Sequence, residues 1–251
     1  MKCQKGIFFY FYIISVPLLF LVLVITTDAF PSDSCIECHR DVKFRVENKV
    51  LFDYYNNWKG SVHDLAGVSC KDCHGGDPAK VKKEEAHPDH LSPDDSSSMV
   101  FYKNIPATCG KCHEKIYANF VQSDHYKALE KTGKGPNCVT CHGSVVTNVY
   151  YASIIVSTCV ICHNQQTQNH PQIISVAEQI LQRLNVSKGY LKWTSIHYKD
   201  EPGKLTEVKA LYQHISDSWH QFHLETTDQD SVKLQSDLEA LFNEAYEKEK
   251  Q

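Results

Sequence analysis

The sequence has very little methionine and no excess of positive charge. Met1 is the initiator, and Met99 is the only other methionine in the 251 residues. The formal net charge is −4 at pH 7. Binding to a nucleic-acid backbone depends on lysine and arginine side chains that neutralise phosphates. We therefore expect no nucleic-acid partner.

Cysteine, by contrast, is abundant and occurs in one repeated local pattern. Ten of the 11 cysteines form five C-x-x-C-H motifs within residues 35–163. A disulfide scaffold does not place a histidine after each cysteine pair, and a zinc ribbon needs none there. The motif is instead typical of c-type haem attachment, in which two thiols bond to the haem vinyl groups and the histidine binds the iron. We predict five covalently attached c-type haems (heme c).

Each motif supplies two attachment thiols and one proximal iron ligand. The predicted attachment residues are Cys35, Cys38, Cys70, Cys73, Cys109, Cys112, Cys138, Cys141, Cys159 and Cys162. The predicted proximal ligands are His39, His74, His113, His142 and His163. Covalent attachment allows short segments to hold a large cofactor without a large apolar core.

The second axial ligand determines what such a haem can do. A haem with protein ligands on both faces transfers electrons, whereas an open face can bind a small molecule. Because Met99 is the only methionine available, at least four of the five haems must lack a methionine ligand. Nine histidines lie outside the motifs, which is more than five haems need. We therefore expect mostly bis-histidine ligation and low reduction potentials.

An internal repeat indicates which histidines serve as second ligands. Motifs two and four share G-x-x-C-x-x-C-H-G, and motifs three and five share I-x-x-T-C-x-x-C-H. An aromatic residue followed by S-x-H precedes each of these two pairs of motifs. We interpret this order as a duplicated module. It favours His63 and His125 as second ligands, and His197, in a looser third copy, less strongly.

Two further histidines complete the predicted set of second ligands. His90 lies in the polar run 85–90, which could equally be a solvated loop. His220 lies on a predicted helix with His214 and His223, and any one of these three could reach back to a haem.

The N-terminus is typical of an export signal. Two lysines precede an apolar run over residues 7–25, and Thr27 and Ala29 place small residues at the −3 and −1 positions of a cleavage after Ala29. Residues 1–29 are therefore a cleaved signal peptide or a retained signal anchor, and both place the rest of the chain outside the cytoplasm. We expect a periplasmic or otherwise exported protein, either soluble or anchored by this segment.

The rest of the chain predicts a mainly α fold with extensive loops. We expect a pentahaem cytochrome module with little regular structure over residues 30–170 and a helical segment over 171–251. Apolar residues recur at helical spacing in 173–184, 205–222 and 232–245, and Gly189 is expected to end the first of these helices.

Two stretches, residues 61–75 and 104–125, resemble exported multihaem c-type cytochromes. The nearest groups are the cytochrome c554-like and NapC/NirT-like cytochromes, which share haem-packing patterns with hydroxylamine oxidoreductase. The resemblance covers about residues 35–165. It implies closely packed haems that form a wire, S-x-H histidines as distal ligands, and respiratory electron transfer outside the cytoplasmic membrane. This sequence differs from NapC/NirT-like proteins, which often carry four haems. Some relatives also have a histidine shortly after C-x-x-C-H-G, but none closely follows Gly143, so the distal ligand of the fourth haem is not assigned.

The sequence favours an electron carrier rather than an enzyme, and we assign no catalytic residue. Its expected partners are redox proteins, among them a quinol-oxidising membrane complex. One alternative is an anchored quinol dehydrogenase of NapC/NirT type. Another is an enzyme or subunit that converts a small nitrogen or sulfur compound at an open haem, although no C-x-x-C-K motif of one nitrite-reductase type is present. A scaffolding subunit and an oligomer also remain open.

Overall fold

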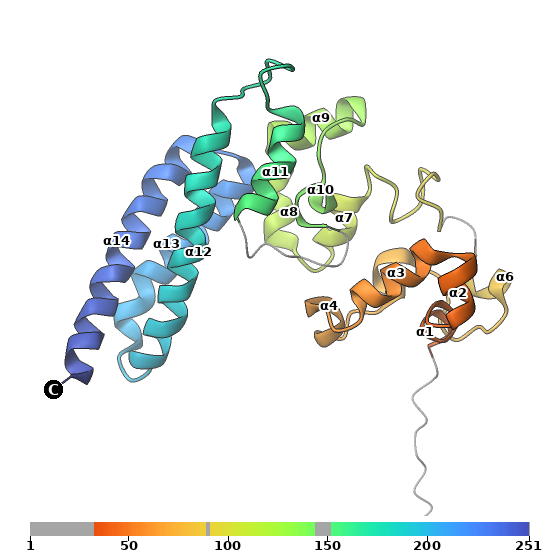
Figure 1. Cartoon of the computed structure of the whole chain (residues 1–251), viewed down its shortest axis with the longest axis horizontal. Helices are drawn as coiled ribbons and strands as arrows, with labels where there is room; N and C mark the ends of the chain where they lie inside the picture. Colours follow the sequence, from red (N-terminus) through yellow and green to blue (C-terminus); the bar gives the residue numbers. More distant parts are fainter. Residues whose placement is uncertain (1–32, 89–90, 144–151, 251) are drawn as a thin grey trace, which may run out of the picture. The chain divides into compact units, whose positions relative to one another are not determined.

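The computed structural model describes residues 33–88, 91–143 and 152–250 (Figure 1). The predicted export segment, 1–29, lies outside these residues. All regular elements in the described ranges are helices, which confirms the predicted mainly α fold with extensive loops. No helix in the described part is long and apolar enough to cross a membrane.

The motif-bearing region consists of short helices joined by turns and loops. They are α1 (Ser34–His39), α2 (Val42–Glu47), α3 (Lys49–Trp58), α4 (Val62–Leu65), α5 (Cys70–His74), α6 (Lys83–Ala86), α7 (Ile105–Gly110), α8 (Glu114–Phe120), α9 (Asp124–Thr132), α10 (Cys138–His142) and α11 (Ala152–Cys162). Such short helices are marginal on their own, so most of their stability must come from what packs on them.

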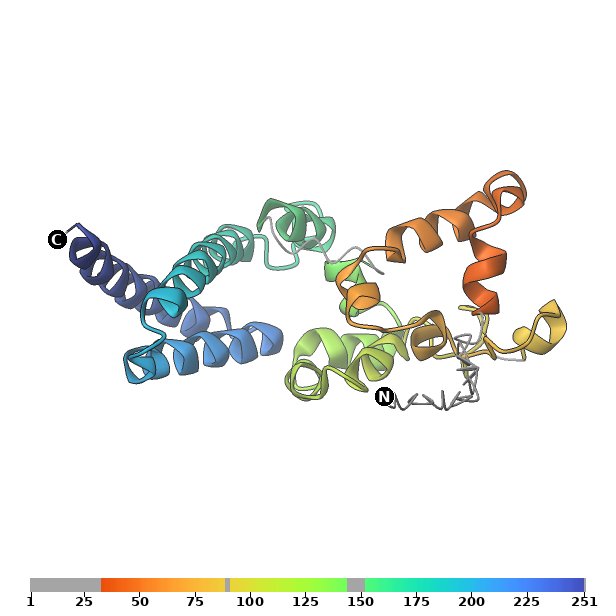
Figure 2. The ribbon, with the colours of Figure 1, turned by 90° about the horizontal axis from the view of Figure 1, so that it is seen from below.

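The C-terminal segment consists of longer helices. They are α12 (Ile173–His197), the short 3-10 helix η1 (Pro202–Leu205), α13 (Thr206–Gln221) and α14 (Leu224–Glu249). Both α12 and α13 pack against α14, and the three helices lie side by side in Figure 1 and Figure 2.

The prediction that Gly189 ends the first of these helices is wrong. α12 continues for eight residues beyond it, to His197. A glycine inside a helix costs only about 1 kcal/mol relative to alanine. Leu191 and Trp193 beyond it pack against the apolar core, and this burial offsets the unfavourable glycine.

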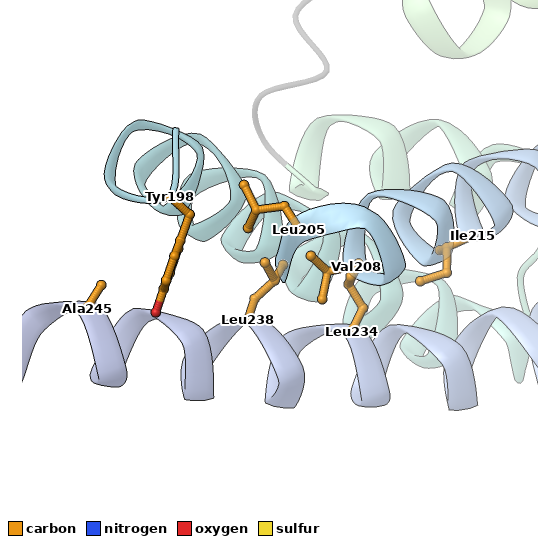
Figure 3. Close-up of a cluster of buried hydrophobic side chains, with 7 residues drawn as sticks. All are labelled: Tyr198, Leu205, Val208, Ile215, Leu234, Leu238 and Ala245. Carbon is orange, nitrogen blue, oxygen red and sulfur yellow. The ribbon is translucent and has the colours of Figure 1, made fainter. Parts of the chain in front are cut away.

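The three C-terminal helices share one apolar core, shown in Figure 3. Leu205, Ile215, Leu234 and Leu238 are almost completely buried there. Tyr198 is also buried, and its hydroxyl donates a hydrogen bond of 3.1 Å to the carbonyl of Leu241. The predicted C-terminal helical segment therefore has the stabilising core of an ordinary globular helical structure.

The first part of the motif region has no comparable core. Between residues 33 and 100, the buried residues in the described ranges are Ser34, Ala86 and Ser98. Large apolar side chains are instead exposed on α2 and α4, with Val46 at 83% and Leu65 at 80% of their full accessible area. This region needs something other than its own side chains to bury its apolar surface.

Candidate haem-binding sites

The repeated motifs two and four form matching isolated helices, α5 and α10. Each helix begins with a capping box, made by Ser69 and Asp72 in α5 and by Asn137 and Thr140 in α10. In each pair, the first side chain accepts a hydrogen bond from the backbone amide of the second residue, and the second side chain accepts one from the backbone amide of the first. These contacts allow a helix of five residues to form around the cysteines.

The glycine that ends each of these helices is required by its backbone conformation. Gly75 has φ of 78° and Gly143 has φ of 72°, and residues with a side chain rarely adopt such angles. The glycine of the shared C-H-G sequence therefore stops the helix immediately after the predicted iron ligand.

Motifs three and five have a different structural setting. Both lie at the carboxyl end of a helix, α7 and α11. The amide of His113 bonds to the carbonyl of Cys109 at 3.0 Å, and that of His163 bonds to Cys159 at 2.8 Å. These bonds extend the helical turn to the histidine. The two sequence types of the repeat therefore correspond to two ways of presenting the motif.

Four of the five motif histidines face a second histidine ring. The ring centres are 6.2 Å apart for His39 and His87, 6.3 Å for His113 and His63, 6.2 Å for His142 and His220, and 5.9 Å for His163 and His125. An iron between two imidazoles needs about 6 Å, because each metal–nitrogen bond is about 2 Å and each half ring adds about 1 Å. The donor type and the spacing fit an iron in each pair.

The S-x-H element places its histidine at the start of a helix. Ser61 is the N-cap of α4 and Ser123 is the N-cap of α9. Each hydroxyl accepts from the amide three residues later, at 3.3 Å and 3.1 Å. His63 and His125 are therefore the second residues of their helices.

The pairing is the same in both copies of the proposed module. His63 precedes motif two but faces His113 of motif three, and His125 precedes motif four but faces His163 of motif five. In each copy the S-x-H histidine faces the second motif of the pair that follows it. This agreement supports the duplication inferred from the sequence.

His220 reaches motif four from the C-terminal segment. It lies near the end of α13, and its ring is only 16° from parallel to that of His142. Its Nδ1 lies 2.7 Å from the carbonyl oxygen of Ser216, which leaves Nε2 available for a metal. A ligand histidine held by a carbonyl in this way is typical of metal sites.

His87 faces His39 but is not among the predicted second ligands. The sequence prediction names His90, which lies outside the described residues. His87 follows the short helix α6, and its Nδ1 lies 2.9 Å from the carbonyl oxygen of Lys83. The sequence alone does not single out His87, because its contact with the Lys83 carbonyl depends on the short helix α6.

The third copy of S-x-H has a different structure. Ser195 lies inside α12 rather than at its start, and His197 is the last residue of that helix. The His197 ring stacks on Trp193 with 3.5 Å between ring centres. Its Nδ1 lies 2.8 Å from the carbonyl oxygen of Trp193, and its Nε2 lies 2.7 Å from a carboxylate oxygen of Glu249. Both ring nitrogens therefore have partners within the C-terminal segment.

His74 of motif two differs from the other motif histidines. No second histidine ring faces it among the residues that the structure describes. Burial lowers its pKa. His74 in turn adds to the lowering of the pKa of His39, which burial and His87 mainly cause. The predicted iron ligands of motifs one and two are therefore close to each other.

Burial keeps several facing histidines neutral. It lowers the pKa of His142 and of His220, and together with His163 it lowers the pKa of His125 to about 4. Iron binds the neutral imidazole through its free lone pair, so these rings need not lose a proton near neutral pH.

The thiols of consecutive motifs lie close together. All ten motif cysteines are free. Burial raises the pKa values of Cys35, Cys73 and Cys141, and a thiol of the following motif adds to the effect in each case. Cys109 and Cys138 share a hydrogen bond, which raises the pKa of Cys109 and lowers that of Cys138. The five motifs are therefore neighbours in chain order.

Two curated proteins share sequence similarity with part of this chain. Each is a C-type polyheme cytochrome OmcB from a strain of Geobacter sulfurreducens, and each is 27% identical over 124 residues. The match covers 46% of this chain but only 15% of either relative. No protein-family profile and no solved structure matches. The similarity supports a multihaem c-type cytochrome, without distinguishing the narrower cytochrome groups.

Proposed function

We propose that this chain is an exported electron-transfer protein that holds five covalently attached haems in a series. The observation that carries this proposal is the set of four facing histidine pairs, each with one motif histidine and about 6 Å between ring centres. A haem with two axial imidazoles supplies one-electron transfer at low potential.

The residues of the chain attach, orient and order these cofactors. The motif thiols would form the covalent links to the haems, and the neutral imidazoles of the facing pairs would hold the irons. Carbonyl contacts to Nδ1 of His87, His163 and His220 fix the direction of Nε2. Because consecutive motifs are adjacent, the attachment points form a path from motif one to motif five.

We assign the second ligands from the facing pairs and from what remains. His87, His63, His220 and His125 serve motifs one, three, four and five. For motif two we propose His90, which the sequence offers as a candidate for one remaining haem. His197 is a weaker candidate, since Glu249 binds its Nε2.

A matched pair of variants tests this assignment. In the full haem-loaded protein, His87→Ala should convert one haem from low spin to high spin in the oxidised absorption and electron paramagnetic resonance (EPR) spectra. His197→Ala should leave the spin states unchanged. A spin change in His197→Ala and none in His87→Ala would reverse the assignment.

The haem count and spin states test the function as a whole. Intact mass should give the mature chain plus five haems, and the oxidised protein should be entirely low spin. A chain without covalent haem would overturn the proposal. A high-spin signal in the wild type would favour the alternative of an enzyme with an open haem, and motif two is where we would look for it.

Whether residues 1–29 are removed or retained distinguishes two modes of electron delivery. We propose that exported redox proteins, including a quinol-oxidising membrane complex, are the partners of a released chain. Retention of residues 1–29 would instead favour a quinol dehydrogenase anchored in the membrane. Sequencing the N-terminus of the mature protein distinguishes them, because a chain that begins near Phe30 excludes the anchored form.

A further inference from the structure

Phe222 has an unusual backbone conformation at the end of α13. Its φ is 62° and its ψ is 34°, in the left-handed region that glycine prefers at this position. Its amide bonds to the carbonyls of Ser218 and Trp219. A bulky residue in this conformation is unfavourable, and such outliers persist where the surroundings enforce them.

The Phe222 side chain packs on a proposed iron ligand. Its ring centre lies 4.1 Å from that of His125, at an interplanar angle of 81°. This is an edge-to-face contact, which aromatic rings favour. The contact restricts rotation of the His125 imidazole.

His125 lacks the carbonyl contact that orients other histidines of the site. Its Nδ1 is buried and has no hydrogen-bond partner. By contrast, Nδ1 lies 2.9 Å from a carbonyl oxygen in His87 and 2.7 Å from one in His220. Those two carbonyls belong to residues four positions earlier in a helix. His125 is the second residue of α9, so no helical carbonyl lies four positions before it.

Two contacts fix the end of α13 beside α8, which leads into the S-x-H element. Lys115 pairs with Asp217 at 2.8 Å. Gln221 donates a hydrogen bond of 2.8 Å to Asn119. The position of Phe222 next to His125 is therefore set by packing between two helices and not by a flexible end.

We propose that Phe222 is a positioning residue for His125, replacing the missing Nδ1 contact and keeping that nitrogen without an acceptor. This inference rests on the proposed role of His125 as the second ligand of motif five. An imidazole whose N–H has no acceptor is a weaker electron donor to iron. The haem of motif five should therefore have a higher reduction potential than one bound by two carbonyl-held histidines.

Phe222→Gly tests the proposal in the full haem-loaded protein. Glycine suits the left-handed backbone, so α13 and the His142–His220 pair should persist. His125 and Phe222 line a hollow that opens to solvent, so removal of the ring should let water reach Nδ1 and accept its hydrogen bond. We expect one step of the redox titration to move to lower potential.

EPR supplies a second readout, because the angle between two axial imidazoles sets the anisotropy of a low-spin ferric signal. The planes of His125 and His163 lie at 61°, and those of His142 and His220 at 16°. Phe222→Gly should alter one strongly anisotropic signal and leave the nearly parallel pair unchanged. Phe222→Tyr, which keeps the ring, should retain the wild-type signals and potentials.

The outcomes separate this inference from the proposed function. If wild-type protein shows five low-spin haems while Phe222→Gly leaves every signal and potential unchanged, the positioning role is rejected and the function stands. If the wild type lacks low-spin haems, the proposed function itself fails.

Discussion

The first part of the motif region and the C-terminal segment differ in how much apolar core they contain. In the C-terminal segment, three long helices bury Leu205, Ile215, Leu234 and Leu238 in one apolar core. In residues 33–100, Ala86 is the buried apolar residue of the described part, and large side chains such as Val46 are exposed. If the proposed haems are bound, they would supply the core that residues 33–100 lack, whereas the C-terminal segment has a core of its own side chains.

The largest test of this comparison is to withhold the cofactor. A full-length chain produced without haem attachment should lose the structure of residues 33–100, because short helices without a core are unstable. The segment 173–249 should stay helical. Limited proteolysis should leave a resistant fragment that contains residues 173–249, and circular dichroism should show the remaining helix. Equal protection of residues 33–100 in haem-free and haem-loaded chains would contradict the comparison.

The next test removes apolar contact from the C-terminal core. Leu238 is completely buried, so Leu238→Ala should lower the free energy of unfolding of this segment by about 2–5 kcal/mol. Denaturant unfolding of the haem-loaded protein, followed by circular dichroism, measures the change. Val232→Ala, on the exposed side of the same helix, is the matched control and should change it by no more than about 0.5 kcal/mol. Similar losses in the two variants would argue against a specific core.

A third test probes the point where the two regions depend on each other. His220→Ala should make one of the proposed haems high spin, because the proposed ligand opposite His142 is lost. His214→Ala, on the same helix, is the control, since His214 is largely exposed and lies 3.4 Å from Asp230. Absorption and EPR spectra of the oxidised proteins give the result. No change in His220→Ala would mean that the C-terminal segment supplies no iron ligand.

The smallest expected effect concerns acid stability of the C-terminal segment. Hydrogen bonds from Lys204 and Lys248 lower the pKa of Glu244 from 4.5 to about 2. Since the folded-state pKa is lowered, this contribution is complete above about pH 4.5 and disappears as the pH falls toward 2. The pairs are exposed, so the effect is small.

Glu244→Gln isolates that contribution. Between about pH 5 and pH 3, wild-type protein should lose more thermal stability than Glu244→Gln does. Glu247→Gln, which removes a carboxylate paired with Lys250 at the end of the same helix, is the control and should follow the wild type. Parallel acid curves for wild type and Glu244→Gln would refute the prediction.

Sequence reasoning succeeds where the chemistry is local. The mainly α fold, which the structure confirms, depends on neighbouring residues. The haem-attachment roles of the C-x-x-C-H residues stay predictions. The S-x-H element is local as well. Its serine is the N-cap of a helix, so the histidine two residues later lies in the first turn. The three amphipathic stretches of the C-terminal segment also correspond to α12, α13 and α14.

Sequence reasoning fails where tertiary packing decides. The sequence does not single out His87, because this histidine faces His39 only through the short helix α6. His90 lies outside the described residues, so its role as a ligand stays a prediction. Gly189 reads as a helix end, but burial beyond it extends α12. The sequence around His197 resembles the other two S-x-H elements, but Ser195 lies inside α12 and not at its N-terminus. The role of His197 as a ligand stays a prediction.

The pairing of distant histidines has a consequence for how the protein is made. A chain that leaves the cytoplasm from its N-terminus exposes motif four at residues 138–142, but its facing histidine, His220, emerges about 80 residues later. Motif five differs, since His125 precedes it. The fourth attachment point would therefore be completed last, after α13 has emerged. Under the proposed ligation, a chain that stops before residue 220 lacks the histidine that faces His142, so its fourth haem site would have no second protein ligand.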